Sequence, residues 1–317
     1  MDSLIHQVWF VGGLSLMYVG FLFVIAIWGS RWMRPSWQPY VYSLTLAIFC
    51  TTWAFYGTVQ QALTHGWILA PTYAGAILLI TVGWKVMDRI IQIARQENST
   101  TISDFISARF GHSRGVGILV ALLCLLGVVP YIALQLKAVS ASFQLVTLTS
   151  SVELSWYSDP TLIIAGIMAI FSILFGTRTV DSSESHQGMM LAIAFESLVK
   201  LVALTAVGLF AVYGLYDGFA DLVNKAMAEG DIARTLTDYA DPSVYLTHAL
   251  LGGIAIIALP RHFHVAVVEY RSQRDIRAAR WMFPLYLLAI NLFVLPLGMV
   301  AMLNQDLLES FTYITLE

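Results

Sequence analysis

Long blocks of apolar residues, separated by short polar connections, dominate this chain. A helix needs roughly 20 apolar residues to cross about 30 Å of hydrocarbon. The blocks predict eight transmembrane helices, over 8–28, 40–62, 67–86, 116–148, 161–175, 189–213, 245–259 and 281–303. We therefore expect an all-α polytopic membrane protein that is embedded in a lipid bilayer, with no soluble domain large enough to hold a core of its own.

The positions of lysine and arginine predict how these helices are oriented. Thirteen of the 17 Lys and Arg residues fall in one set of connections, whereas only Lys225 and Arg234 fall in the opposite set. Positively charged residues favour the cytoplasmic side of a membrane. We therefore expect the N-terminus, the acidic segment 217–241 and the end of the chain to lie outside.

Composition and charge exclude several classes of protein. The chain is 58% hydrophobic and 12% charged, with a formal net charge of −3, whereas soluble domains carry about 25% charged residues. A soluble enzyme is excluded, and nucleic acid is not an expected partner because no basic surface is present. The cysteines, Cys50 and Cys124, lie in apolar runs, and His262 and His264 have no thiol or carboxylate cluster nearby. We expect no disulfide framework, no metal site and no catalytic residues within the chain.

Three ionisable side chains lie inside predicted spans, where charge is costly and usually faces a partner or a cavity. Glu196 and Lys200 are four residues apart, the spacing at which side chains meet on a helix. One interpretation is a neutralising pair that only fastens helices together. The other is an ion or proton relay formed by Lys137, Glu196 and Lys200. Asn291, a lone polar residue of the last span, is expected to join neighbouring helices.

Several spans carry signs of interruption. Pro130 predicts a kink, with Gln135 and Lys137 just beyond it, although packing alone explains Gln135 as well. Hydroxyl side chains in the second span can cap broken backbone, and paired glycines weaken the seventh span unless they mark close packing. Interrupted spans in two halves of a chain predict a transporter site at the bilayer midplane. The expected solute site comprises Phe49, Cys50, Thr51, Thr52, Trp53, Gln135, Lys137, Gly252 and Gly253.

Some strings resemble the sodium/solute symporter family. Thr101–Phe110 (TISDFISARF) resembles the cytoplasmic segment before the fourth helix of that family. Gly176, the acid-x-x-Gln spacing of Glu184 and Gln187, and the Pro260 end of the seventh span fit the same family. The resemblance covers nearly the whole chain. It implies a LeuT-type fold, with two inverted five-helix repeats behind one extra N-terminal helix and with the second repeat incomplete here.

Three further strings, over 130–137, 194–201 and 259–269, resemble the membrane part of CbrA-type sensor histidine kinases. In those proteins a symporter-like domain precedes cytoplasmic kinase modules, which use ATP and signal to a response regulator. The resemblance implies a bacterial inner (cytoplasmic) membrane location and a small polar solute, an amino acid, as ligand. The chain is then a truncated piece, 1–317, of a symporter-like domain, although a complete eight-helix protein stays open.

One departure from the pattern of this family bears on which ion drives transport. Sodium-coupled members of the family commonly carry an aspartate on the first core helix, and the matching position here is Phe49. The missing carboxylate favours a proton gradient over a sodium gradient, or sensing with little transport. We therefore expect the transport and sensory domain of an amino-acid-responsive histidine kinase. The alternatives are a stand-alone secondary solute:cation symporter without signalling, and a structural membrane subunit with no ligand.

Overall fold

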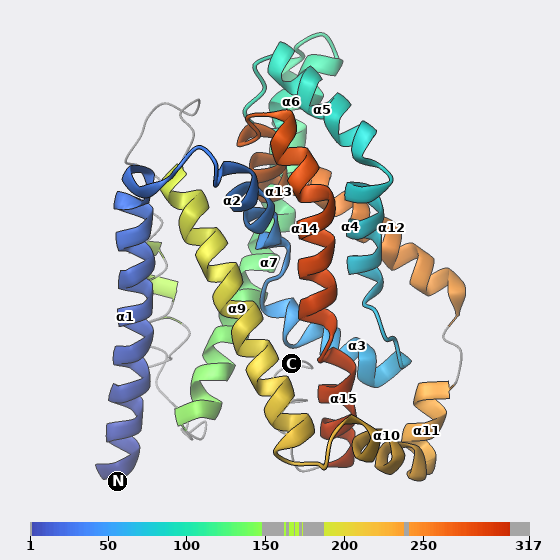
Figure 1. The fold of residues 1–317 in the computed structure, drawn as a ribbon. Helices are drawn as coiled ribbons and strands as arrows, with labels where there is room; N and C mark the ends of the chain where they lie inside the picture. The colour runs from blue at the N-terminus through green and yellow to red at the C-terminus, as the bar shows by residue number, and fades with distance from the viewer. Residues whose placement is uncertain are drawn as a thin grey trace.

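The computed structural model is helical throughout the part of the chain that it describes (Figure 1). The described residues are 2–147, 162, 165–167, 169–170, 173, 187–237 and 241–304. Within them the all-α prediction is confirmed. The predicted span 161–175 lies mostly outside these residues, as do Gly176, Glu184 and the end of the chain after Asn304.

Four helical rods in the described ranges are long and apolar enough to cross a membrane, and together they make the chain a multi-pass membrane protein. They are α1 (Asp2–Trp32), α7 (Arg114–Thr147), α9 (Gln187–Tyr213) and the joined pair α14 (Gln273–Asn291) and α15 (Val294–Leu303). Counting α11 (Gly230–Thr237) and α12 (Pro242–Ala258) as one bent span gives up to 5. The count of eight, the LeuT-type arrangement and the outside N-terminus stay predictions.

The second predicted span is broken near its middle. It consists of α2 (Gln38–Thr45), the 3₁₀ turns η1 (Leu46–Phe49) and η2 (Thr52–Ala54), and α3 (Gly57–His65). Between the two turns, Cys50 and Thr51 have extended backbone, with ψ of 98° and −159°. The Thr51 hydroxyl accepts a hydrogen bond from the Trp53 backbone N–H at 3.4 Å. The interruption capped by hydroxyls, predicted from the sequence, is confirmed.

The third predicted span contains α4 (Pro71–Thr81), which packs along α12 and is followed by α5 (Trp84–Gln96). Glycines lie where the two helices meet, because a Cβ atom at Gly75 would overlap the backbone of Ala249, and one at Gly252 would overlap Thr72. The α12 helix continues through Gly252 and Gly253. Of the two interpretations of these glycines, the interruption is wrong and close packing is confirmed, because the close approach of α4 and α12 accounts for them. Membrane helices use small residues in this way where their backbones come close together.

Replacing Gly252 by alanine is expected to lower the free energy of unfolding by about 1–3 kcal/mol, the usual cost of overpacking. The added Cβ would meet Thr72 backbone atoms, and a helical backbone cannot move aside as a flexible side chain can. Thermal unfolding in detergent measures the effect. Gly127→Ala on α7 is the matched control, because nothing lies within 4 Å of a Cβ there. Equal melting temperatures for the two variants would contradict this account of the packing.

The seventh predicted span is interrupted later, at its end. Leu259 is extended, with ψ of 129°, and is followed by α13 (Pro260–Phe263) and the π-helical turn η4 (His264–Val268). Proline at the first position of α13 removes an N–H that would otherwise continue α12. The chain then enters α14 through a capping box formed by Ser272 and Asp275.

The two ends of the bundle carry different short helices. At one end α6 (Ile102–Arg109) starts at a capping box of Thr101 and Asp104. Figure 1 shows α5 and α6 at the end opposite α10 (Phe219–Ala228) and α11, and the N-terminus lies at the same end as the latter pair, on the other side of the bundle. The basic connection that contains α5 and α6 thus lies at the end opposite the acidic segment that contains α10 and α11, as the predicted orientation requires.

The first half of the broken span is held at the centre of the bundle by hydrogen bonds to backbone carbonyls. The Tyr42 hydroxyl donates to the Ala266 carbonyl at 2.7 Å, and Thr45 Oγ1 donates to the Met190 carbonyl at 3.1 Å. The predicted role of Asn291 is confirmed, because its Nδ2 donates to the Ile68 carbonyl at 2.6 Å and its Oδ1 accepts from the Ala70 N–H at 3.3 Å. The contacts of Tyr42 and Thr45 fix α2, and the break that follows it lies between α9 and α7.

Candidate functional site

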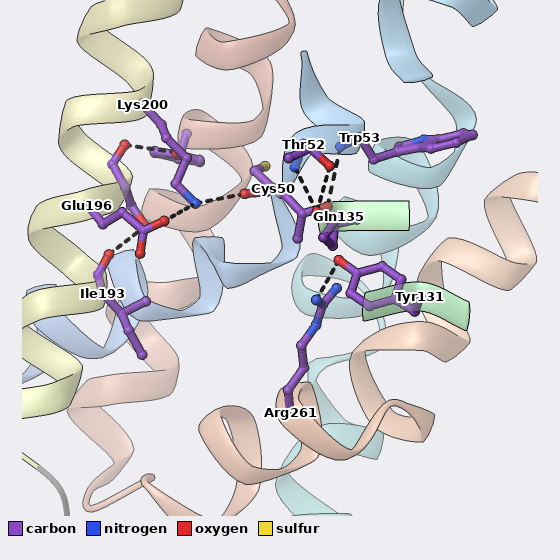
Figure 2. Close-up of polar contacts among 12 residues, drawn as sticks. Cys50, Thr52, Trp53, Tyr131, Gln135, Ile193, Glu196, Lys200 and Arg261 are labelled. Carbon is purple, nitrogen blue, oxygen red and sulfur yellow. Dashed lines mark hydrogen bonds and ion pairs between the residues drawn. The ribbon is translucent and has the colours of Figure 1, made fainter. Parts of the chain in front are cut away.

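A helix that stops inside a membrane leaves carbonyls at one end and N–H groups at the other without partners. At the break, the Cys50 carbonyl and the Thr52 N–H are such groups. Figure 2 shows side chains from two different helices reaching them, Lys200 from α9 and Gln135 from α7. The break is therefore a place where backbone polarity faces side chains far away in sequence.

Lys200 contacts the carbonyl end of the break. Its Nζ donates to the Cys50 carbonyl oxygen at 2.9 Å and lies 3.0 Å from Glu196 Oε1 (Figure 2). The Lys200 side chain is 19% exposed and that of Glu196 is 39% exposed. A positive charge is favourable there, because the carbonyl end of a helix is its negative end. The pairing of Glu196 with Lys200, expected from their spacing, is confirmed; the ion or proton relay stays a prediction.

Gln135 contacts the other side of the break. Its Oε1 accepts from Thr52 Oγ1 at 2.6 Å and from the Thr52 N–H at 3.3 Å (Figure 2). The backbone N–H can only donate, so this contact fixes which end of the amide is oxygen. The Gln135 Nε2 is buried and has no hydrogen-bond partner among the described residues. A buried donor without a partner is costly, and it is the strongest sign of a ligand in this region.

Lys137 does not join the predicted relay. It is half-buried and forms no hydrogen bond or ion pair with any residue that the structure describes. The reason is geometric, because two residues along a helix turn the side chain by about 200°. When Gln135 points at the break, Lys137 points away from it. Of the expected triad the structure pairs Glu196 with Lys200, and a role of Lys137 in the relay or at the solute stays a prediction without support from its contacts.

Phe49, at the end of η1, belongs to a group of rings. Its ring centroid lies 5.4 Å from that of His262, 6.1 Å from Tyr73 and 6.3 Å from Phe283. These rings close the space beside the break on the side of α4, α13 and α14. The Cys50 side chain is fully buried, whereas Trp53 is 43% exposed. The break therefore has an apolar wall at Phe49, and the polar contacts are those of Lys200 and Gln135.

A contact between Tyr131 and Arg261 lies next to this site and was missed by the sequence analysis. Arg261 Nη1 donates to the Tyr131 hydroxyl at 2.5 Å, and its guanidinium lies 4.3 Å from the ring centroid (Figure 2). Tyr131 is four residues before Gln135, so both lie on one face of α7. That spacing is the signal that could have drawn attention to Tyr131. The arginine comes from α13, directly after the interruption at Leu259.

Gly252 and Gly253 lie apart from these contacts. In the described chain a Cβ at either position would meet backbone atoms of Thr72 or Gly75 on α4. The structure thus brings together Cys50, Thr52, Gln135 and the Glu196–Lys200 pair, and it places both glycines in a helix interface.

One known protein gives a match. The chain is 21% identical over 269 residues to a Bacillus subtilis (strain 168) protein named uncharacterized symporter YodF, a match that covers 83% of this chain and 50% of the relative. The chain therefore spans about half the length of the curated relative that it matches. No protein-family model matches the chain, and no solved structure does.

Proposed function

We propose that the chain is the membrane domain of a solute symporter, which binds a small polar solute at the break between η1 and η2. The observation that carries this proposal is the unpaired Gln135 Nε2, buried beside unwound backbone. Discontinuous helices are where transporters place their substrates, because their ends present oriented backbone dipoles. The similarity to a protein named as a symporter supports the same class of function.

The solute contacts proposed here are the backbone and hydroxyls of Cys50–Trp53, together with Gln135. A ligand that fits must offer an acceptor to Nε2, and a carboxylate or carbonyl oxygen does so. An amino acid, the ligand that the kinase resemblance implies, has both an acceptor of this kind and a positive group. The Trp53 ring packs on Gly57 and is 43% exposed, and in Figure 2 it points away from Gln135.

The stand-alone symporter is the form of this proposal that the comparisons favour, because the matching relative is named as a symporter and no comparison points to kinase modules. A sensory role, with a response regulator and ATP used in modules beyond this chain, therefore stays a prediction from the resemblance. The expected location of the protein in a bacterial inner membrane also stays a prediction. Binding would drive transport only if the solute prefers one access state over the other.

Uptake by the full-length protein in membrane vesicles tests the proposal. A panel of labelled amino acids is supplied with a proton gradient in sodium-free choline buffer, and then with a sodium gradient instead. We expect accumulation of at least one amino acid above protein-free vesicles, and its loss when a protonophore removes the gradient. Lack of binding and uptake for the whole panel would contradict the amino acid as solute, and a panel of other small acids would then test the symporter class itself.

A further inference from the structure

The carbonyl end of the break already holds a cation, and it is part of the protein. Lys200 Nζ lies 2.9 Å from the Cys50 carbonyl oxygen and 3.0 Å from Glu196 Oε1. A carbonyl at the negative end of a half-helix and a carboxylate are the oxygen ligands that a sodium ion takes in transporters built on broken helices. Here both oxygens face one ammonium group.

Among the described residues, Phe49 and the acidic side chains add no further ligand for a metal cation. Phe49 precedes Cys50 and presents a ring that packs on His262 and Phe283. Within the described chain, Glu196 is the acid paired with the ammonium, and no group of three His, Cys, Asp or Glu side chains is placed to hold a metal. A sodium ion entering here would meet a positive charge at hydrogen-bonding distance from its own ligands, and like charges repel.

We infer that the Lys200 ammonium takes the place of a metal cation at the break, so that this site excludes sodium. Lys200 then determines ion specificity for the proposed transport, and the coupling cation must bind elsewhere or be a proton. The idea deepens the proposed function, because it names the ion that the same site rejects. It also has a readout that needs no solute, since sodium binding can be measured on the protein alone.

The experiment compares thermal unfolding of the full-length protein in sodium chloride and in choline chloride at equal ionic strength. The wild type is expected to melt at the same temperature in both salts. In Lys200→Ser the shortened side chain leaves the Cys50 carbonyl, the Glu196 carboxylate and a new hydroxyl around an open space. Sodium is expected to raise the melting temperature of this variant saturably, by about 2–4 °C.

Two further variants serve as controls. Lys225→Ser removes the lysine of another (i, i+4) pair, in which Lys225 Nζ lies 2.7 Å from Asp221 Oδ2 on exposed α10. It is expected to show no sodium effect, because exposed charges attract salts without selecting among them. Lys200→Arg keeps the positive charge at the break and is also expected to stay insensitive to sodium.

Either of two results would overturn the inference. A saturable, sodium-specific stabilisation of the wild type would show that sodium binds despite Lys200. A folded Lys200→Ser with equal melting temperatures in both salts would show that the lysine does not occupy a cation site. If the serine variant fails to fold, Lys200→Gln replaces it, and the wild-type measurement still decides. Because no solute is added, failure here is distinguishable from failure of the proposed transport.

Discussion

Gln135→Glu is expected to weaken solute binding at least tenfold while the protein keeps its fold. Glutamate retains an oxygen that accepts from both donors of Thr52, so the contacts at 2.6 and 3.3 Å survive. Only Nε2 is lost, the one buried donor of this side chain without a partner among the described residues. Loss of one hydrogen bond to a charged acceptor costs about 1.5–3 kcal/mol, and every 1.4 kcal/mol changes a dissociation constant about tenfold.

The measurement is the concentration dependence of initial uptake, for the solute that the wild type accumulates best, with thermal unfolding recorded on the same preparations. Gln96→Glu on exposed α5 introduces the same charge away from the break and serves as the matched control. Gln135→Leu provides a second comparison, because it also removes the acceptor for Thr52 and should lose stability as well as binding. Unchanged uptake by folded Gln135→Glu would remove Gln135 from the solute site.

Removal of the contact between Arg261 and Tyr131 is expected to have the second largest effect. The hydrogen bond of 2.5 Å and the guanidinium over the ring at 4.3 Å act together on half-buried groups. Cation–π contacts reach about 2 kcal/mol when they are shielded from water. A double-mutant cycle with Arg261→Gln and Tyr131→Leu should therefore give a coupling free energy of about 2 kcal/mol.

The cycle is read from melting temperatures in detergent and from uptake rates in vesicles. Tyr131→Phe separates the two parts of the contact, because it keeps the ring and removes the hydroxyl. Arg280→Gln is the matched control, since that guanidinium also lies over a ring, at 4.7 Å from the Trp84 centroid, but next to the cytoplasmic end predicted for α14. Additive effects of the two substitutions would show that Arg261 and Tyr131 do not stabilise each other.

Features that depend on neighbours in the sequence could be predicted from the sequence. The capping box at Thr101, the pairing of Glu196 with Lys200 and the capped break at Thr51 each involve residues four or fewer apart. Helix geometry alone determines such contacts. The all-helical, multi-pass character follows from the apolar blocks for a similar reason, because hydrocarbon forces the backbone to satisfy its own hydrogen bonds.

Features that depend on the packing of distant segments could not be predicted in this way. Lys200 contacts a carbonyl 150 positions away, and Gln135 contacts Thr52 across 83 positions. The glycines at 252 and 253 left two interpretations open, because a glycine pair looks the same in a weak helix and in a close interface, and only the partner helix α4 distinguishes the two. The contacts of Lys137 could not be predicted either, because residues two apart on a helix point in different directions.

The single turn of α7 between Tyr131 and Gln135 makes the two interruptions of the bundle mechanically dependent. Gln135 fastens this turn to the break in the second span, and Tyr131 fastens it to α13, just after the break at Leu259. Both side chains lie on one turn of the same helix, so a rotation of α7 as a rigid body moves both of them together. A rotation of α7 that withdraws Gln135 from Thr52 must also displace Tyr131 from Arg261. A solute that moves α7 away from the break would therefore also loosen the neighbouring contact of Tyr131 with Arg261.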